Sequence, residues 1–126
     1  MKLAKPTLIA LLAALVAGPA LAEGDAEKGK KVYNKCKACH DIGEGAKNKV
    51  GPALTGIVGQ EIASVEGFSY SDAFMAKKGE GLVWTEENLT TYLEKPKDMI
   101  PGTKMSFAGL KKEDERADVI AYIKSF

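Results

Sequence analysis

The sequence has very few of the residues that usually bind metals or carry out redox chemistry, since its 126 residues include two cysteines and one histidine. A structural zinc site needs four ligands, usually from two Cys or His pairs, and no second pair is present. A thioredoxin-like dithiol follows a strand in a βαβ pattern, and no strand rich in Val and Ile precedes Cys36. A disulfide between Cys36 and Cys39 remains possible in an exported protein, but it would leave His40 without a role.

The sequence also lacks a strong excess of charge of one sign, with 18 basic and 17 acidic side chains and a formal net charge of +1. A protein that binds nucleic acid usually has a clear basic bias, so we expect no nucleic-acid partner. The charge is nevertheless uneven, because lysines are frequent between residues 28 and 49 and acidic residues between 113 and 118. Such a lysine-rich region can be an ordinary solvated surface or a docking face for an acidic partner.

Long hydrophobic runs are missing too, because the apolar run Leu8–Ala17 is much shorter than the roughly 20 residues that span a bilayer. It follows Lys2 and Lys5 and precedes Ala20-Leu21-Ala22, which has the small-x-small pattern of a cleavage site. We therefore predict a secretory signal peptide over residues 1–22, cleaved after Ala22, and one mature domain over residues 23–126. Loss of the two leader lysines would change the formal net charge from +1 to −1.

What the sequence does contain is Cys36-Lys37-Ala38-Cys39-His40, which has the spacing of a c-type haem attachment site. Each thiol can add to one haem vinyl group, which gives two thioether bonds, and the imidazole of His40 can then bind the iron. The motif uses every Cys and every His in the chain. Haem is attached to such proteins outside the cytoplasm, so this prediction agrees with the predicted leader.

The rest of the chain predicts an all-α fold, because no stretch alternates as a strand does. Helices are expected over residues 25–35, 69–78, 85–95 and 113–126, and the Gly- and Pro-containing segments 43–59 and 95–109 are expected to form the walls of a cofactor pocket. Asp25 and Thr85 are suitable N-caps, and Ser69 with Asp72 resembles a capping box. Pro96 is expected to end the third helix. Apolar side chains at helical spacing should face the core; they are Val32, Tyr33, Leu89, Tyr92, Leu93, Val119, Ile120, Ile123 and Phe126.

The ligand opposite His40 decides what a haem could do here, because an open iron position binds small molecules and a filled one only exchanges electrons. Methionine is the plausible ligand, since its soft thioether sulfur raises the reduction potential. The candidates are Met75, on the expected helix 69–78, and Met99 and Met105. The last two flank residues 100–104, where Pro101 and Gly102 favour a rigid turn. Spacing alone does not choose between them.

Taken as a whole, the sequence resembles the class I c-type cytochromes, and among them bacterial cytochrome c2 and mitochondrial cytochrome c. The matching blocks are Gly24–Gly29, Cys36–His40, Gly51–Leu54, Gly67–Tyr70, Trp84, Tyr92–Leu93, Ile100–Met105, Phe107–Gly109 and Ile120–Tyr122. The resemblance implies a small cytochrome c fold, in which the N- and C-terminal helices cross and short helices and loops surround one covalent haem c. It also implies that Gly29 and Tyr33 on the first helix meet Val119 and Tyr122 on the last.

The resemblance assigns roles around the haem. It implies that Met105 is the axial ligand opposite His40 and that Met99 is a packing residue. The carbonyl of Pro52 is expected to accept a hydrogen bond from His40 and so fix the orientation of the imidazole. The other residues expected in the haem environment are Tyr70, Trp84 and Thr103, as hydrogen-bond donors to the propionates, and Tyr92, near the methionine sulfur. Gln60 stands where mitochondrial relatives have an arginine, which puts the charge pairing of one propionate in doubt.

In function, the resemblance implies a monomeric periplasmic carrier of single electrons, and not an enzyme. A haem peroxidase would need a distal acid–base group, typically a second histidine, and a gas sensor would need an accessible iron. The expected donor is a cytochrome bc1 complex, and the expected acceptor is a photosynthetic reaction centre or a terminal oxidase. The lysines that the resemblance places near an exposed haem edge, facing acidic docking sites, are Lys35, Lys37, Lys95, Lys97 and Lys104.

Overall fold

The regular secondary structure of the chain is helical, as the sequence predicts. The computed structural model describes residues 3–4 and 23–126. Its elements are α1 (Ala26–Val32), the 3-10 turn η1 (Tyr33–Lys35), α2 (Asp72–Gly79), α3 (Glu86–Glu94), α4 (Pro96–Met99) and α5 (Glu113–Lys124). Within these residues the only β contact is an isolated antiparallel bridge between Glu61 and Val83. The predicted signal peptide, apart from residues 3–4, lies outside the described residues. None of the described helices has the length and apolarity needed to cross a bilayer.

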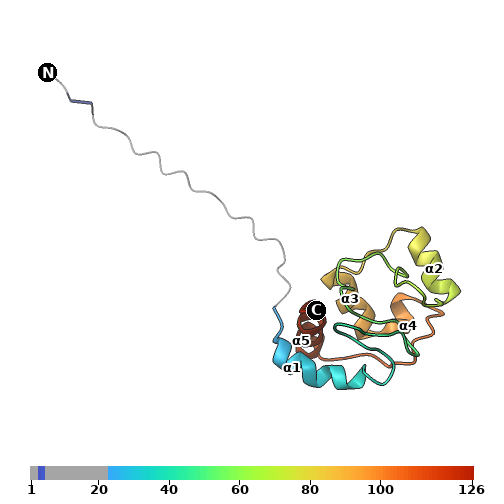
Figure 1. The fold of residues 1–126 in the computed structure, drawn as a ribbon. Helices are drawn as coiled ribbons and strands as arrows, with labels where there is room; N and C mark the ends of the chain where they lie inside the picture. The colour runs from blue at the N-terminus through green and yellow to red at the C-terminus, as the bar shows by residue number, and fades with distance from the viewer. Residues whose placement is uncertain (1–2, 5–22) are drawn as a thin grey trace.

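The first and last helices, α1 and α5, pack against each other at one end of the domain (Figure 1). Gly29 makes this close approach possible, because a Cβ at this position would overlap the carbonyl oxygen of Asp118 and lie 2.9 Å from Cβ of Tyr122. Beside the glycine, the rings of Tyr33 and Tyr122 are 5.3 Å apart. Val119 is fully buried. The predicted crossing of the N- and C-terminal helices is therefore confirmed.

Asp25 fixes the N-terminus of α1 by hydrogen bonds within the helix and to the neighbouring helix α5. The carboxylate of Asp25 accepts hydrogen bonds from the amides of Glu27, at 2.9 Å, and Lys28, at 3.2 Å. This confirms the predicted N-cap and provides partners for amides that the helix leaves unpaired. The amide of Asp25 in turn donates to the carboxylate of Asp118 on α5, at 2.8 Å. That bond joins the two ends of the domain, and the sequence did not predict it.

The other helix caps confirm one prediction and correct another. Thr85 caps α3, as predicted, because its hydroxyl accepts a hydrogen bond from the amide of Asn88 at 3.0 Å. The cap of α2 is Ser71 and not Ser69, since Ser71 Oγ accepts from the amide of Phe74 at 3.2 Å. Both serines precede the helix at a plausible distance, but only Ser71 directly precedes the first helical residue. The capping-box prediction was therefore wrong by two residues.

Two further expectations differ from the structure at the C-terminal half. Pro96 ends α3 as predicted, but it also begins the short helix α4, where a loop was expected. Proline suits the first turn of a helix, because its fixed φ is already helical and its missing N–H would be unpaired there. Phe126, expected in the core, lies beyond the end of α5 and is 45% exposed. Its ring packs edge-on against Tyr122, 5.1 Å away.

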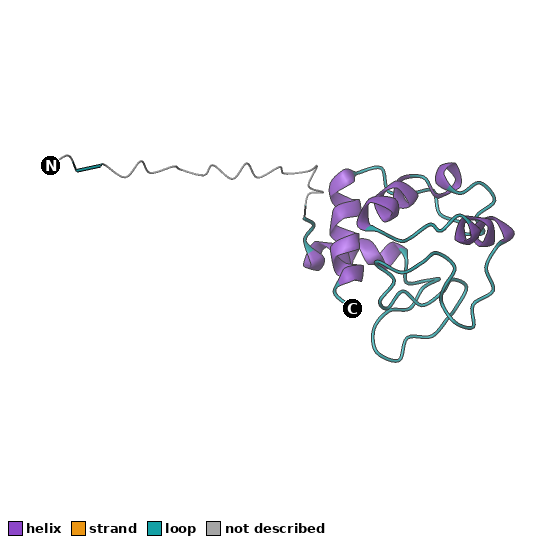
Figure 2. Ribbon diagram, turned by 90° about the horizontal axis from the view of Figure 1, so that it is seen from above, coloured by secondary structure: helices purple, strands orange, loops and turns teal. Residues whose placement is uncertain are grey.

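Long loops account for much of the domain and lie to one side of the crossed helices (Figure 2). The segment between η1 and α2 and the segment between α4 and α5 contain no helix. The buried side chains come from helices and loops together, which gives one core across the molecule. They are Tyr33, Ile57, Ile62, Ala63, Trp84, Leu89, Tyr92, Leu93, Ile100, Leu110, Val119, Ile120 and Ile123. The loops are thus part of the packed structure and can carry precisely placed site residues.

Candidate haem site

The Cys36–His40 motif directly follows η1 and forms a compact turn. The amides of Cys39 and His40 both donate to the carbonyl of Cys36, at 3.1 and 3.0 Å. Both cysteines are free thiols, so the alternative of a Cys36–Cys39 disulfide is wrong for this structure. Cys36 is half-buried and Cys39 is exposed. The turn therefore presents two reduced sulfurs and an imidazole within five consecutive residues.

The two thiols have different surroundings. Burial raises the pKa of Cys36 to about 11, and the charge of Cys39 adds to the increase while Lys35 opposes it. A thiol with a raised pKa stays protonated at neutral pH and is a poor free nucleophile. The folded chain therefore does not present Cys36 as a reactive thiolate.

The ring of His40 is fixed from one side. Its Nδ1 lies 2.8 Å from the carbonyl oxygen of Pro52, so the Nδ1–H tautomer donates a hydrogen bond there and leaves the Nε2 lone pair for a metal. Burial lowers the pKa of His40, with a smaller contribution from Lys49, against the bond to Pro52. A Cβ on Gly51 would lie 2.7 Å from Nδ1 of His40, so only glycine fits beside this ring. The imidazole is thus held neutral and in one orientation.

Met105 lies on the segment between α4 and α5, half-buried and packed against the core. Its amide donates to the hydroxyl of Thr103 at 3.3 Å. The same hydroxyl is hydrogen-bonded to the phenol of Tyr92 on α3, and the two oxygens are 2.8 Å apart. Burial raises the pKa of Tyr92, while the bond from Thr103 acts in the opposite direction. Two residues predicted to surround the haem, Thr103 and Tyr92, therefore bond to each other and hold the loop that carries Met105.

The other two methionines lie in different surroundings. Met99 is half-buried at the end of α4 and packs against the core, as expected for a packing residue. Met75 is 49% exposed on α2. Of the three candidates, Met105 is the one on a loop anchored by side-chain hydrogen bonds.

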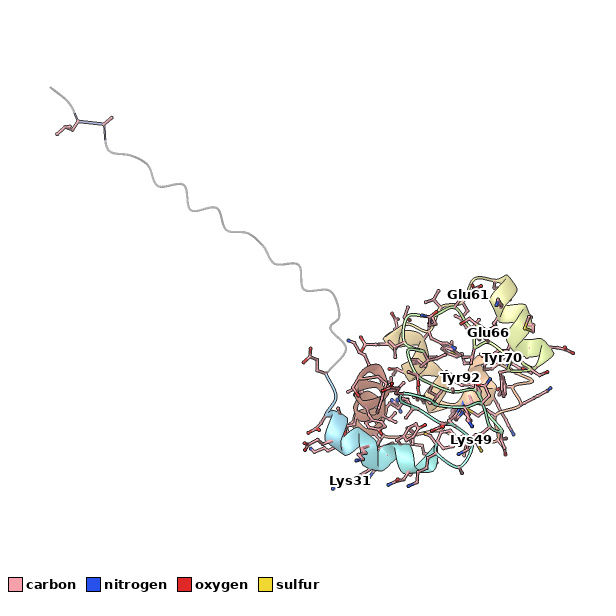
Figure 3. All side chains as sticks on the ribbon, viewed as in Figure 1. Lys31, Lys49, Glu61, Glu66, Tyr70 and Tyr92 are labelled. Carbon is pink, nitrogen blue, oxygen red and sulfur yellow. The ribbon has the colours of Figure 1, made fainter. Side chains whose placement is uncertain are left out.

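Aromatic rings form a connected cluster between α2 and α3. The ring of Phe74 stacks on Tyr70 with centroids 5.9 Å apart and meets Tyr92 edge-on at 5.8 Å. Trp84 lies 5.1 Å from Tyr92 and 6.1 Å from Phe74. Tyr70 and Tyr92, both labelled in Figure 3, lie between α2 and the crossed helices. Three predicted haem-environment residues are thus brought together around Phe74, whose place in the cluster was not predicted.

The residues expected to donate hydrogen bonds to the propionates include Tyr70 and Trp84, and their polar groups have different partners. The hydroxyl of Tyr70 accepts a hydrogen bond from the amide of Val65 at 3.0 Å, which leaves its own proton free for donation. Trp84 is 5% exposed, and its backbone amide donates to the carbonyl of Gln60 at 2.7 Å. The side chain of Gln60 is exposed. The geometry leaves the Tyr70 proton available to an acceptor such as a propionate.

The five lysines of the predicted docking face are all exposed. Lys35 and Lys37 flank Cys36, and Lys104 directly precedes Met105. Two of the five are in long surface ion pairs, Lys35 with Glu115 at 3.8 Å and Lys95 with Asp98 at 3.9 Å. Exposed pairs of this kind contribute little to stability and open readily.

Comparisons with known proteins agree with this site. The cytochrome c family model matches residues 26–126. The chain belongs to the cytochrome c family. Cytochrome c2 of Blastochloris viridis is 53% identical over 116 residues, covering 92% of this cytochrome and 87% of that protein. Cytochrome c-550 of Ancylobacter novellus is 54% identical over 99 residues, covering 79% and 92%.

The solved structures that resemble this cytochrome have the same fold. The structure of cytochrome c2 from Rhodospirillum centenum matches with a TM-score of 0.79 and 42% identity, covering 82% of this cytochrome and 98% of that chain. Cytochrome cH from Methylobacterium extorquens matches with a TM-score of 0.74 and 41% identity, over 82% and 100%. The predicted cytochrome c fold and the class I resemblance are therefore confirmed.

The residues of the motif fit the covalent c-type haem that members of this family carry. Cys36 and Cys39 provide two free thiols at the attachment spacing, and His40 directs an unengaged nitrogen away from Pro52. Haem c is the cofactor of this cytochrome, and electron transport is the activity of the family.

The sequence reasoning missed Gly51, although its position directly before Pro52 was a possible signal. It also missed Arg116, a buried cation in the apolar stripe of α5.

Proposed function

We propose that this cytochrome is a periplasmic one-electron carrier whose haem iron is ligated by His40 and Met105. The observation that carries the proposal is the arrangement of the two side chains. The imidazole of His40 is fixed through Nδ1 with Nε2 free, and Met105 is carried by a loop anchored to α3 through Thr103. A nitrogen and a thioether that occupy both axial positions leave no site for a substrate.

When bound, the haem supplies an iron that gains and loses one electron. The protein residues keep the ligands in place during that exchange. Pro52 holds the proton on Nδ1 of His40, so the imidazole stays neutral and Nε2 keeps its lone pair. The packed rings of Phe74, Trp84 and Tyr92 would provide an apolar wall for the haem, and low polarity around a bound iron would favour the reduced state. We assign the free proton of Tyr70 to a propionate, because a buried carboxylate needs a donor.

An enzymatic role receives less support from the same residues. The sequence has a single histidine, and its Nδ1 is already engaged with Pro52. No second histidine is therefore present to act as the distal acid–base group of a peroxidase. With Met105 in the sixth position, we expect neither peroxide turnover comparable to a peroxidase nor carbon monoxide binding without loss of the methionine bond.

The axial role of Met105 can be tested by optical spectroscopy. Ferric haem with a methionine ligand has a weak far-red absorption band. We expect the native protein to show this band and Met105→Ala to lose it. Met75→Ala is the matched control, because Met75 is 49% exposed on α2 and should leave the band intact. A band that survives in Met105→Ala would reject the proposed ligand.

The proposed partners are a cytochrome bc1 complex as donor and a photosynthetic reaction centre or terminal oxidase as acceptor. Similarity to cytochrome c2 of Blastochloris viridis and cytochrome c-550 of Ancylobacter novellus supports the proposal, as does the exposure of Lys35, Lys37, Lys95, Lys97 and Lys104. Brief encounters between opposite charges are fast and are weakened by salt. Oxidation rates measured with isolated reaction centres and oxidases at several ionic strengths would identify the acceptor.

Recovery of a mature chain beginning at Glu23 from the periplasm would confirm export and cleavage after Ala22.

A further inference from the structure

Arg116 is a buried cation with few partners. It is the only arginine in the sequence, and it is 7% exposed near the start of α5. Within residues 23–126 no carboxylate forms an ion pair with it, and its Nε atom is buried without a hydrogen-bond partner. The adjacent Glu115 pairs with Lys35 instead. Burying a guanidinium without a counter-charge is unfavourable, so the side chain needs a specific role to account for its position.

Within residues 23–126 the side chain of Arg116 makes one hydrogen bond, which is short and is accepted by a backbone carbonyl. Its Nη1 donates to the carbonyl of Leu110 at 2.6 Å, inside the protein. The amide of Leu110 donates to the carbonyl of Leu93 on α3 at 2.7 Å, and the side chain of Leu110 is 2% exposed. The residue is therefore bonded on its amide side to α3 and on its carbonyl side to α5. We call these two bonds the Leu110 clamp.

The backbone before Leu110 also fits the clamp closely. Gly109 has a φ of +107°, a conformation that favours glycine, and a Cβ there would overlap the carbonyl oxygen of Glu94. Any side chain at position 109 would push Leu110 away from α3. The glycine therefore allows both bonds of the clamp, the one to Leu93 and the one to Arg116, to form.

The clamp lies at one end of the loop that carries Met105. Between Ile100 and Leu110 this loop has no helix or strand, and its backbone bonds are short-range, such as Thr103 to Ile100 and Phe107 to Met105. It is joined to the helices by hydrogen bonds at Ile100, which bonds to Pro96 in α4, at Thr103 through Tyr92 and at Leu110 through the clamp. The clamp is the one of these that fixes the loop on the C-terminal side of Met105.

We propose that Arg116 is a positioning residue for the sixth ligand: by holding the Leu110 carbonyl, it keeps the loop closed and Met105 on the iron. The proposal rests on the axial role proposed for Met105. Loss of Arg116 would leave a buried carbonyl unpaired and would release the α5 side of the clamp. The loop would then open more often, and Met105 would leave the iron more often, while α1 and α5 stay packed.

The rate of loop opening can be measured by imidazole binding to the ferric protein, because at saturating imidazole the observed rate approaches the rate at which Met105 leaves. Arg116→Met keeps an unbranched, flexible side chain and removes the donor. Val119→Ala is the matched control, since Val119 is fully buried on the same helix and does not contact the clamp through any hydrogen bond. The two variants are compared at denaturant concentrations that give them the same free energy of unfolding. Under these conditions we expect the rate at saturating imidazole to be about tenfold higher in Arg116→Met than in Val119→Ala, as for one lost charge-assisted bond. Equal rates would overturn the proposal.

Arg116→Lys provides a milder test if Arg116→Met does not yield folded protein. A lysine keeps the charge but not the planar fork that reaches the Leu110 carbonyl. We expect faster hydrogen exchange over residues 104–110 in Arg116→Lys than in Val119→Ala, and unchanged exchange in α1. Equal exchange over that segment rejects the role of Arg116. The far-red band of the native protein tests the ligand role of Met105 separately. If the band is absent, the proposed ligand is rejected, and the hydrogen-exchange result alone decides whether Arg116 holds the clamp.

Discussion

At the scale of single residues, the hydroxyl of Thr103 connects two parts of the site. It lies 2.8 Å from the phenol oxygen of Tyr92 on α3 and 3.3 Å from the amide of Met105. A buried hydroxyl pair contributes only modestly to stability when complete, but leaving one partner unpaired is expensive. Small changes at Tyr92 or Thr103 should therefore affect the Met105 loop before they affect the rest of the fold.

Removal of the Tyr92 hydroxyl tests this connection. We expect Tyr92→Phe to lower the free energy of unfolding by about 1 kcal/mol and to weaken the far-red band. Tyr122→Phe is the control, because the Tyr122 ring packs on Tyr33 and Phe126 and its hydroxyl has no hydrogen bond to any of residues 23–126. Denaturant unfolding and the optical spectrum measure the two effects. If both variants behave alike, the Tyr92–Thr103 bond does not hold the loop.

Gly51 supports the opposite face of the site. A Cβ added there would lie 2.7 Å from Nδ1 of His40, closer than atoms tolerate without a shift. We expect Gly51→Ala to displace the imidazole, to weaken its bond to Pro52 and to lower both haem-protein yield and reduction potential. Val50→Ala is the neighbouring control, since Val50 is 79% exposed and should tolerate truncation. Redox titration of the two variants is the measurement, and identical potentials would contradict the expectation.

At the scale of elements, the crossing of α1 and α5 depends on one glycine. Gly29→Ala would place a Cβ against the backbone of Asp118, so the helices would have to separate. We expect a loss of about 2 kcal/mol or more in the free energy of unfolding, as for overpacking in a core. Gly79→Ala is a matched control, because Gly79 lies in α2 with nothing within 4 Å of its added Cβ. That variant should be neutral or slightly more stable, and equal losses in both would refute the role of Gly29.

Local sequence signals were sufficient for most helices. Asp25 and Thr85 were predicted as caps because each places a side-chain oxygen directly before a helical run, and both bonds are present. Ser69 was mistaken for Ser71 because two serines stand close together and the cap depends on which backbone is extended. Pro96 was taken as a stop only, although proline equally begins helices. The first error concerned only a helix boundary, whereas the second left the short helix α4 unpredicted.

Long-range contacts were harder to predict. The bond from Asp25 to Asp118 and the bond from Arg116 to Leu110 depend on how α5 lies on its neighbours. No local pattern contains that information. Arg116 in particular looks like an ordinary polar residue in a sequence, since an arginine on a helix is usually solvated. The cysteines and the histidine of the site could be predicted because they are adjacent in the chain. The ligand role of Met105 stays a prediction, which rests on the resemblance of its loop to that of a known family.

At the scale of the whole molecule, charge should control encounters. We expect Lys97→Glu to slow electron transfer to an acidic acceptor at low salt and to have little effect at high salt, because screening reduces attraction between exposed charges. Lys112→Glu makes the same change in net charge at the start of α5, at a lysine outside the predicted docking face, and should have a smaller effect. Rates measured over a range of ionic strength test this. Equal slowing in both variants would indicate that net charge, and not a docking face, matters.

The haem should also matter for folding of the whole domain. A domain of this size buries a modest fraction of its surface, and much of this one consists of loops. We expect a variant in which Cys36 and Cys39 are both alanine, prepared without haem, to show far less helical circular dichroism than the native cytochrome. A well-folded spectrum from the haem-free variant would show that the core of the protein is sufficient by itself.

The pairing of α1 with α5 has a consequence for the order in which the chain is made. The first helix of the domain finds its partner only after the last residues have been synthesised, since more than 80 residues separate Gly29 from Asp118. Such distant contacts form late, because the intervening chain must first be closed into a loop. Until then the Cys36–His40 segment follows a helix without a partner and remains open. The interval before the two ends meet is therefore the time in which both thiols can be reached for haem attachment.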